Sequence, residues 1–319
     1  MTHTSSKPVI GIGACLVGQP VRYNGDSKRQ NPHIEALKNH LQFNSFCPEV
    51  AIGLGVPRET IRLVGELATV QLMDSNTQSI DYSEPMKNYA AKISKQHGDL
   101  AGYILVKGSP SCGYDRVKRY NQQGNVAGHD AMGLFAQALQ QKDPLLPMEE
   151  DGRLHDPALR ENFISRVYAY HDWKQCINNG VSHRQLIEFW ARYKYLVMAH
   201  HISNYQKIGR LLANNNYQSI DQLAAEFIHL LMQSLTVLAS RKSRSNVLEH
   251  IRGYLKKQLD SNDKNELSQL INQYRDGTVP LIVPLTLLRH HFKHHHHSYI
   301  DQQVFFHPYP EQLSLRNTL

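Results

Sequence analysis

Hydrophobic residues in the first half of the chain follow the pattern of buried strands separated by helices. Residues 8–14 and 101–106 are short, nearly continuous apolar runs, which predicts two buried strands. Between them, residues 32–41 and 84–96 carry apolar side chains at helical spacing. Strands that alternate with helices predict an α/β domain, a Rossmann-like sheet with flanking helices, over residues 1–150.

In the second half, apolar residues repeat with helical spacing throughout. Ser219-Ile-Asp-Gln222 fits a capping box in front of a long apolar run. Two further amphipathic helices are predicted between residues 247 and 274. Residues 158–319 are therefore predicted to form an all-α domain.

Turn-forming residues indicate breaks in these patterns. Gly277 is expected to end a helix, and Pro280 and Pro284 to block its resumption. The segment 142–157 holds three prolines, a glycine and the acidic run 149–151. This composition predicts a connector between the two domains.

Composition places the chain among ordinary globular proteins. It has 319 residues, of which 41% are hydrophobic and 20% charged, a balance unlike that of disordered chains. No apolar run reaches the roughly 18 residues that a membrane helix needs. The N-terminus lacks the apolar segment of a secretory signal, so we expect a cytoplasmic protein without membrane association.

Positive charge is concentrated in the helical half. Residues 1–157 carry 16 basic and 16 acidic side chains, whereas residues 158–319 carry 19 basic and 12 acidic ones. The whole net charge of +7 therefore lies in the second half. This asymmetry favours an anionic partner, with nucleic acid first, although a solvated basic surface is the alternative.

Three of the four cysteines lie in the α/β half, and four are too few for a disulfide scaffold. Cys15 and Cys112 follow the two predicted strands, and Cys47 follows a short segment that we expect to be another strand end. Ligands of α/β sheets gather at the C-terminal ends of strands. Cys176 has no supporting motif and is interpreted as structural.

The loop Ser109-Pro-Ser-Cys-Gly113 surrounds a thiol with small and hydroxyl side chains, which would leave backbone N–H groups free to point at sulfur. Cysteines on three separate loops do not match a zinc ribbon, which needs paired Cys-x-x-Cys spacings. Two interpretations stay open: buried structural thiols, or a three-thiolate [4Fe-4S] site with one open iron.

Two other motifs carry little chemistry. Gly11-Ile-Gly13 is not a dinucleotide-binding motif, because Leu16 stands where the third glycine would be required. The histidine-rich stretch 290–297 is expected to be a flexible loop that binds metal only adventitiously.

Several motifs, in this order, resemble the signature of the thiouracil desulfidase (TudS-like) family. They are Gly13-Ala-Cys-Leu-Val-Gly18, Arg22-Tyr-Asn-Gly25, Cys47-Pro-Glu49, Gly53-Leu-Gly-Val-Pro-Arg58 and Lys107-Gly-Ser-Pro-Ser-Cys-Gly113. The helical half resembles the YbgA-type domain that is often fused to that desulfidase. It does so through Lys194-Tyr-Leu-Val-Met-Ala-His200, Pro280-Leu-Ile-Val-Pro284 and the segment 308–317.

The resemblance implies an iron-sulfur enzyme that acts without net redox change. In the family, three cysteines, here Cys15, Cys47 and Cys112, hold a [4Fe-4S] cluster. The thiocarbonyl sulfur of a thiopyrimidine binds the open iron, and water replaces sulfur to leave a carbonyl and hydrosulfide. Glu49 matches the acid/base candidate and Ser109 a residue beside the substrate.

Each of these candidate residues also has an ordinary structural interpretation. Glu49 could be a surface or capping carboxylate, and Ser109 a turn-forming hydroxyl. Lys107 and Ser111 are expected to contact the substrate beside the cluster. Asp26 could orient the substrate or close a turn.

Basic residues interleaved with aromatic ones suggest that the helical half binds RNA, through phosphate contacts and base stacking. The alternative is a solvated helix face with its aromatic side chains in the core. The aromatic residues are Trp190, Tyr193, Tyr195 and Tyr205. The candidate RNA-binding residues are Lys194, Lys207, Arg210, Arg241, Lys242, Arg244, Lys256 and Lys257.

Family members with the fused helical domain are associated with removal of sulfur from 4-thiouridine in tRNA, so the resemblance implies thiolated tRNA as substrate. The thiouridine would have to be unstacked to reach iron. A second hypothesis is action on free thiouracil or a thionucleotide. A third is a non-catalytic RNA-binding protein with a structural or redox-sensing cluster.

Overall fold

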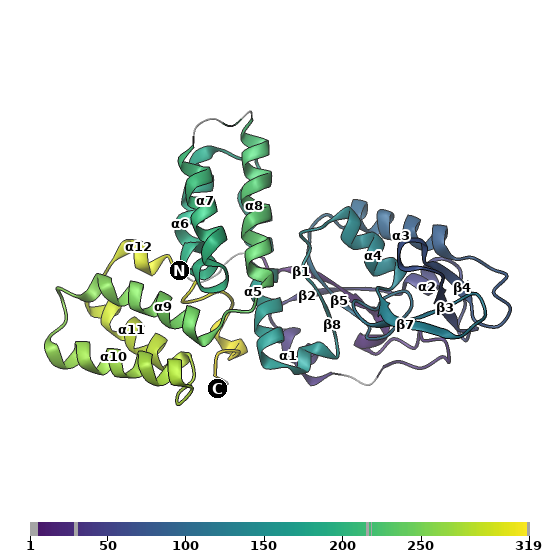
Figure 1. The fold of residues 1–319 in the computed structure, drawn as a ribbon, viewed down its shortest axis with the longest axis horizontal. Helices are drawn as coiled ribbons and strands as arrows, with labels where there is room; N and C mark the ends of the chain where they lie inside the picture. Colours follow the sequence, from purple (N-terminus) through teal and green to yellow (C-terminus); the bar gives the residue numbers. More distant parts are fainter. Residues whose placement is uncertain (1–5, 29–30, 215–216, 218, 318–319) are drawn as a thin grey trace. The chain divides into compact units, whose positions relative to one another are not determined.

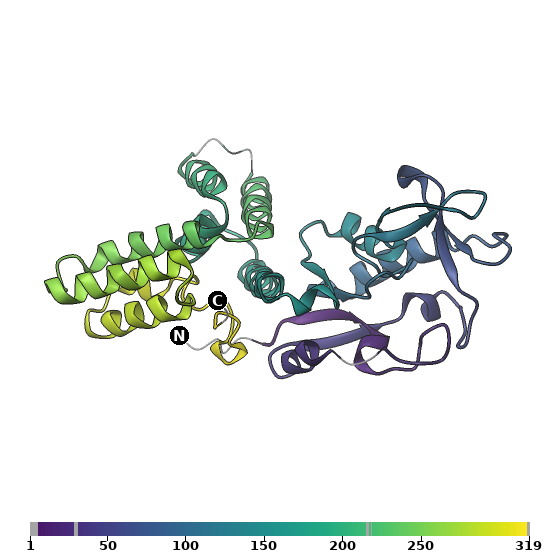
Figure 2. The same ribbon diagram turned by 60° about the horizontal axis from the view of Figure 1, so that its bottom comes forward.

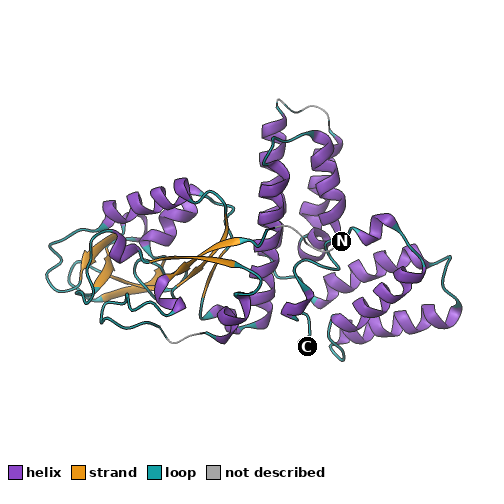
Figure 3. Cartoon of the chain, turned by 180° about the vertical axis from the view of Figure 1, so that it is seen from behind, coloured by secondary structure: helices purple, strands orange, loops and turns teal. Residues whose placement is uncertain are grey.

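The computed structural model describes the chain except for residues 1–5, 29–30, 215–216, 218 and 318–319. The start of the N-terminal segment, on which the expected lack of a secretory signal partly rests, therefore lies outside the described residues. The chain forms two compact units that meet in sequence between Asp156 and Pro157 (Figure 1). Figure 3 shows the strands of the N-terminal unit and the mostly helical C-terminal unit.

A four-stranded parallel sheet forms the centre of the N-terminal unit, as the sequence predicts. Its order is β2 (Gln42–Phe46), β1 (Val9–Gly13), β5 (Leu100–Leu105) and β8 (Met148–Glu150). All three strand pairs are parallel. Every residue of β5 is buried, which agrees with its continuous apolar run. The strand order reverses between β1 and β5, where sheets of this kind bind ligands.

Close packing between the two central strands explains one glycine of the Gly-x-Gly sequence. A Cβ atom at Gly11 would lie 2.3 Å from the ring of Tyr103, which packs across β1 from β5. Gly11 therefore makes room for a buried aromatic ring.

Helices and short 3-10 turns connect these strands. The predicted helix 32–41 is α1 (Pro32–Leu37), which starts at the Asn31 side chain as N-cap and ends earlier than expected. The predicted helix 84–96 is α3 (Ser83–Gln96). The remaining helical segments of this unit are η1 (Ala14–Val17), α2 (Pro48–Ala51), η2 (Leu67–Thr69), α4 (Leu134–Lys142) and η3 (Arg153–His155).

A second, mixed sheet was not predicted. Its order is β4 (Gln71–Asp74), β3 (Ile61–Val64), β6 (Val117–Tyr120) and β7 (Val126–Ala131). Only β3 pairs with β6 in parallel, and the outer pairs are antiparallel. These strands are short, and most residues of β7 are exposed. They therefore lack the apolar runs that identify strands in a sequence.

The prediction that residues 142–157 form a linker between the domains is wrong. Its centre forms β8, which pairs with β5, and the acidic side chains Glu149, Glu150 and Asp151 are buried. Arg153 binds Glu149, and Glu150 accepts the backbone N–H of Tyr114. Partners from elsewhere in the unit thus allow an acidic, proline-rich segment to form an edge strand.

The C-terminal unit consists of helices, as predicted. Figures 1 and 2 show α9, α10 and α11 side by side. The helices are α5 (Pro157–Ile177), α6 (His183–His200), α7 (Ile202–Ala213), α8 (Ile220–Thr236), α9 (Arg241–Arg252), α10 (Ser261–Asp276), α11 (Ile282–His294) and α12 (Ser298–Asp301), with the short turns η4 (Gly253–Leu255) and η5 (Glu311–Leu313).

Local signals at the helix ends are partly confirmed. The Ser219 side chain caps α8 by accepting the backbone N–H of Gln222. Gly277 ends α10 with φ of 87°, the left-handed region that favours glycine. Pro284 does not block a helix, because it lies in the first turn of α11, where a missing N–H costs nothing.

The histidine-rich stretch 290–297 is the expected loop only at residues 295–297. Residues 290–294 form the last turn and a half of α11, and His291 is buried. Among the described residues, no helix is long and apolar enough to cross a membrane.

Candidate active site

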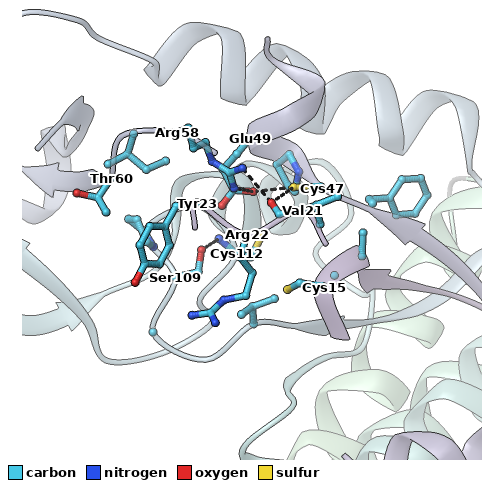
Figure 4. Close-up of a pocket in the computed structure, with 18 of the residues that line it drawn as sticks. Cys15, Val21, Arg22, Tyr23, Cys47, Glu49, Arg58, Thr60, Ser109 and Cys112 are labelled. Atoms are coloured by element: carbon cyan, nitrogen blue, oxygen red, sulfur yellow. Dashed lines mark hydrogen bonds and ion pairs between the residues drawn. The ribbon is translucent and has the colours of Figure 1, made fainter. Parts of the chain in front are cut away.

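The three cysteines of the N-terminal unit lie at the C-terminal ends of three neighbouring strands. Cys15 follows β1 in η1, Cys47 follows β2 as the N-cap residue of α2, and Cys112 lies in the loop after β5. All three line one cavity of about 270 Å³ (Figure 4). The parallel sheet therefore brings together thiols that are up to 97 residues apart in the sequence.

Burial makes these thiols reluctant to ionise. Cys15 and Cys112 are buried, Cys47 is half-buried, and none of them forms a disulfide. Burial raises the pKa of all three thiols, and the nearby Glu49 carboxylate raises it further, to about 11 for Cys47. The thiolate forms that bind metal therefore need a positively charged group in the cavity to stabilise them.

The chemistry of the donors fits an iron-sulfur cluster. Within the part of the chain that the structure describes, no three His, Cys, Asp or Glu side chains converge closely enough to hold one metal ion. Three thiols that surround a cavity without converging are compatible with the larger frame of an iron-sulfur cluster, which binds cysteine thiolates. The donor set and its spread thus fit such a group.

Glu49 lies against two of the cysteine-bearing segments. Its Oε2 atom is 3.3 Å from Cys47 Sγ, and its Oε1 atom accepts a short hydrogen bond from the Ser111 hydroxyl. Arg58 Nη2 lies 3.9 Å from the same carboxylate. The surface-carboxylate interpretation is therefore wrong, because the Glu49 side chain is only 13% exposed and faces the cavity.

Ser109 and Ser111 extend this hydrogen-bonded group. Their hydroxyls are 2.9 Å apart, and Ser111 Oγ also lies 3.6 Å from Cys112 Sγ. Ser109 lines the cavity, whereas Ser111 is fully buried behind it. The prediction that Ser111 contacts substrate is therefore corrected: this hydroxyl joins Ser109 to Glu49.

Backbone N–H groups of this loop do not point freely at sulfur, contrary to expectation. The N–H groups of Ser111 and Cys112 both donate to Ser109 Oγ, and Gly113 N–H donates to Ser109 O. These bonds hold the loop in a tight turn. The Ser111 hydroxyl is the group of this loop that contacts the Cys112 sulfur.

The other predicted substrate contacts have different outcomes. Lys107 lines the cavity, and its contact with substrate stays a prediction. Asp26 does not, since its carboxylate accepts a 2.6 Å hydrogen bond from Asn24 and its backbone oxygen accepts the N–H of Arg22. Asp26 therefore closes a turn. Cys176 lies in α5, in the other unit, and takes no part in this site.

Sequence reasoning assigned no role to four cavity residues: Arg22, Tyr23, Arg58 and Thr60. Arg58 is largely buried, and its guanidinium donates to the backbone oxygens of Val21 and Gly55 at 2.9 and 3.2 Å. The one feature of the sequence that could have identified Arg58 is its position at the end of the 53–58 motif. Arg58 links this loop to Glu49, which only the fold reveals.

In the helical unit, two of the candidate RNA-binding arginines are engaged inside the protein. Arg244 forms a 2.7 Å ion pair with buried Glu161, so its selection as an RNA-binding residue was wrong. Arg241 donates to the backbone oxygen of Tyr274 at 3.1 Å and lies over that ring. Both arginines connect helices.

The remaining candidates are at or near the surface. Lys194 is half-buried beside the rings of Tyr195 and Tyr299. Of the expected stacking residues, Tyr193 and Tyr195 belong to the core, whereas Trp190 and Tyr205 are half-buried with ring centres 5.6 Å apart. The exposed basic candidates are Lys207, Arg210, Lys242, Lys256 and Lys257.

Comparison with known proteins separates the two units in the same way. Residues 10–151 match a protein-family model described as 2-thiouracil desulfurase. Residues 194–310 match one described as a protein of unknown function (DUF1722).

Two similar proteins each correspond to about half of the chain. The uncharacterized protein YbgA of Escherichia coli (strain K12) is 26% identical over 159 residues, which are 50% of this chain and 94% of that protein. A solved structure described as the [4Fe-4S]-dependent thiouracil desulfidase TudS is 29% identical, with 49% of this chain and 98% of that chain covered and a TM-score of 0.38. The predicted resemblance, a desulfidase-like N-terminal unit with a YbgA-like C-terminal region, is confirmed.

Proposed function

We propose that this chain is a [4Fe-4S]-dependent desulfidase that removes sulfur from 4-thiouridine in tRNA, giving uridine and hydrosulfide without net redox change. The observation that carries the proposal is that Cys15, Cys47 and Cys112 line one cavity together with Glu49. That cavity lies in the segment that matches the 2-thiouracil desulfurase model.

The three cysteines would hold the cluster. When bound, it would supply an open iron that accepts the thiocarbonyl sulfur and withdraws electrons from the C=S carbon. Burial disfavours free thiolates here, so the protein holds these ligands protonated until a positively charged group replaces the protons.

Glu49 is suited to move a proton in the reaction. Replacement of C=S by C=O consumes one water, whose oxygen bonds to carbon while sulfur leaves as hydrosulfide and a proton is released. Glu49 would take a proton from the attacking water, since its carboxylate faces the cavity. The Ser109–Ser111–Glu49 hydrogen bonds and Arg58 fix the orientation of that carboxylate.

The helical unit would supply the contact with tRNA. The five exposed basic candidates form no ion pair with a carboxylate among the described residues, so their charge is available to phosphates. They are Lys207, Arg210, Lys242, Lys256 and Lys257. Together with the excess positive charge of this half, they support an RNA-binding surface.

A second candidate substrate is a free thiopyrimidine. The cavity of about 270 Å³ would also hold the cluster, so the space left beside it suits a small ligand such as one pyrimidine ring. Both substrates would use the same chemistry, and they differ in whether the helical unit contributes.

The first experiment measures iron and acid-labile sulfide after anaerobic purification, for the wild type and for Cys112→Ser. We expect about four of each per chain in the wild type, most of it lost in the variant together with sulfide release from 4-thiouridine in tRNA. Cys176→Ser is the matched control and should keep both. A wild type without iron after anaerobic reconstitution would refute the desulfidase proposal.

The second experiment replaces Lys256 and Lys257 by alanine together. We expect several-fold weaker binding of tRNA and a salt dependence whose slope falls by about 1.4, because each of the two lost phosphate contacts removes roughly 0.7 for unpaired RNA. Turnover of free thiouracil should stay at the wild-type rate. The matched control is Lys92→Ala/Lys95→Ala, on the exposed side of α3. Unchanged tRNA binding would remove these lysines from the RNA surface.

A further inference from the structure

A second cavity lies wholly within the C-terminal unit and has a volume of about 480 Å³. Its lining comes from α11, from α12 and from the segment 306–311 near the end of the chain. The predicted RNA-binding residues are not part of this lining. The desulfidation chemistry makes no use of it either, so the cavity has no assigned role.

Two cations of α11 line this cavity. Arg289 and Lys293 are four residues apart, so both lie on one side of the helix. Like charges at this spacing repel each other and destabilise a helix unless an anion lies near both. Lys293 is exposed and forms no ion pair with a carboxylate among the described residues. Its charge is therefore available to a ligand.

The acidic side chains of the lining are already engaged. Asp301 Oδ2 lies 3.1 Å from His296 Nδ1. Glu311 Oε1 accepts from Arg289 Nη1 and lies 2.9 Å from His307 Nδ1. One carboxylate oxygen thus serves a guanidinium and an imidazole, and burial lowers the pKa of Arg289 in spite of Glu311. A further anion in the cavity would stabilise this guanidinium.

The inner surface of the cavity is apolar. Phe292, Ile300 and Phe306 line it, and all three side chains are buried. The centres of the two phenyl rings lie 6.3 Å apart. The exposed imidazole rings of His290 and His296 line the same cavity. Charged groups and imidazoles therefore surround an apolar surface that could pack against a ring.

These features indicate a ligand that combines an anionic group with a flat ring. The volume of about 480 Å³ lies within the range of roughly 300–1,000 Å³ usual for small-molecule sites, and inorganic phosphate would fill only a small part of it. Arginine and lysine bind phosphate oxygens, whereas phenylalanine and histidine rings pack against bases. A single metal ion is not indicated, since among the described residues no three His, Cys, Asp or Glu side chains converge closely enough.

We propose that this cavity binds one nucleotide, with Arg289 and Lys293 on its phosphate and the apolar surface against its base. The nucleotide comes either from solution, as a mononucleotide, or from an unpaired position of an RNA strand. Both sources present the same phosphate, sugar and base. The cavity belongs to the other unit, so its ligand does not depend on desulfidation at the cysteine-lined cavity.

The test is equilibrium binding to the cluster-loaded protein, measured by calorimetry with adenosine 5′-monophosphate, adenosine and inorganic phosphate. A purine is used because a pyrimidine would also suit the cysteine-lined cavity. We expect the monophosphate to bind at least tenfold more tightly than adenosine or phosphate alone. Equal binding of the monophosphate and inorganic phosphate would mean that only charge is recognised, which would overturn the proposal.

A double variant places the binding in this cavity. Arg289→Ala/Lys293→Ala should lower the affinity for the monophosphate at least tenfold and leave that for adenosine within twofold. The matched control is Lys264→Ala/Arg275→Ala, which removes a lysine and an arginine of α10 that do not line the cavity. It should bind like the wild type. Monophosphate binding that survives loss of both α11 cations would place the ligand elsewhere and refute the proposal.

A further variant guards against a simple loss of folding, since replacement of Arg289 breaks its pair with Glu311. Lys293→Glu changes only an exposed side chain and reverses its charge. It should lower the affinity for the monophosphate at least tenfold, with unchanged helix content by circular dichroism and unchanged sulfide release from 4-thiouracil. Wild-type affinity in this variant would contradict a phosphate contact at Lys293.

A short single-stranded RNA separates the two sources of the nucleotide. A fluorescent five-nucleotide oligoadenylate that binds at least tenfold more tightly than the monophosphate, and less tightly to Arg289→Ala/Lys293→Ala, would assign the cavity to unpaired RNA. A smaller difference, or tighter binding of the monophosphate, would assign it to a free nucleotide. Absence of sulfide release from every thiolated substrate would refute desulfidation and leave these binding results as they stand.

Discussion

Two carboxylates, the half-buried Glu49 of the N-terminal unit and the buried Glu161 of the C-terminal unit, occupy contrasting surroundings. Glu161 accepts from Arg244 at 2.7 Å and from Arg316 at 2.9 Å, with the Tyr309 hydroxyl 3.2 Å away. Glu49 has one arginine at 3.9 Å, a serine hydroxyl and a cysteine thiol. Glu161 is therefore neutralised inside the fold, whereas Glu49 lies among groups that can still lose protons.

This difference separates structural from chemical use of a buried charge. Burial by itself raises the pKa of Glu161, but the charges of Arg244 and Arg316 outweigh it and lower the pKa to about 2. The charge of Glu49 acts on its neighbours instead. It adds to the effect of burial and raises the pKa of the thiols of Cys15, Cys47 and Cys112. A carboxylate beside protonated thiols, which must lose their protons to bind metal, is the arrangement of a site that takes up a positively charged group.

The largest effect is expected for Glu49→Gln. Loss of the proton-accepting carboxylate should lower kcat for sulfide release by about 10²–10⁴-fold, with iron content unchanged. Glu84→Gln, a surface residue paired with Lys87, is the control and should keep full turnover. A Glu49→Gln enzyme that turns over at the wild-type rate would show that the carboxylate is structural, like Glu161.

Glu161→Gln should reduce stability and leave the chemistry of the other unit intact. Removing one partner leaves two buried arginines without their counter-charge, which costs about 3–5 kcal/mol. Both tryptophans, Trp173 and Trp190, belong to the C-terminal unit, so urea unfolding followed by tryptophan fluorescence reports on it. Glu188→Gln, which breaks the exposed pair with Arg184, should cost less than about 1 kcal/mol. If both variants lowered the free energy of unfolding equally, Glu161 would not be the buried, paired carboxylate described here.

Acid should abolish the difference between wild type and Glu161→Gln. The pKa of Glu161 falls from 4.5 to about 2 on folding, so its stabilisation is complete above pH 4.5 and is lost as the pH falls towards 2. The shift corresponds to about 3 kcal/mol at 1.36 kcal/mol per pKa unit. Urea midpoints at pH 7, 4 and 2.5 should converge for the two proteins. A constant gap would mean that the arginines do not control this carboxyl group.

Local patterns predicted the parallel sheet, the helices and the cavity cysteines, since each depends on short stretches of sequence. The runs before Cys15 and Cys112 are apolar enough to identify strands, and strand ends of one parallel sheet meet at one edge. The mixed sheet was missed because its strands are short and partly exposed. Edge strand β8 was missed because its buried acid Glu150 depends on a partner far away in the sequence, the backbone N–H of Tyr114.

The sequence by itself determined which residues could do chemistry: three cysteines after strands, a carboxylate beside one of them and an excess of positive charge in the helical half. Tertiary structure decided which of those charges are available. Arg244 pairs with Glu161 across 83 residues, and Ser111 reaches Glu49 across 62. Ion pairs and hydrogen bonds form between groups that the fold brings within a few ångströms, and no local pattern records that distance.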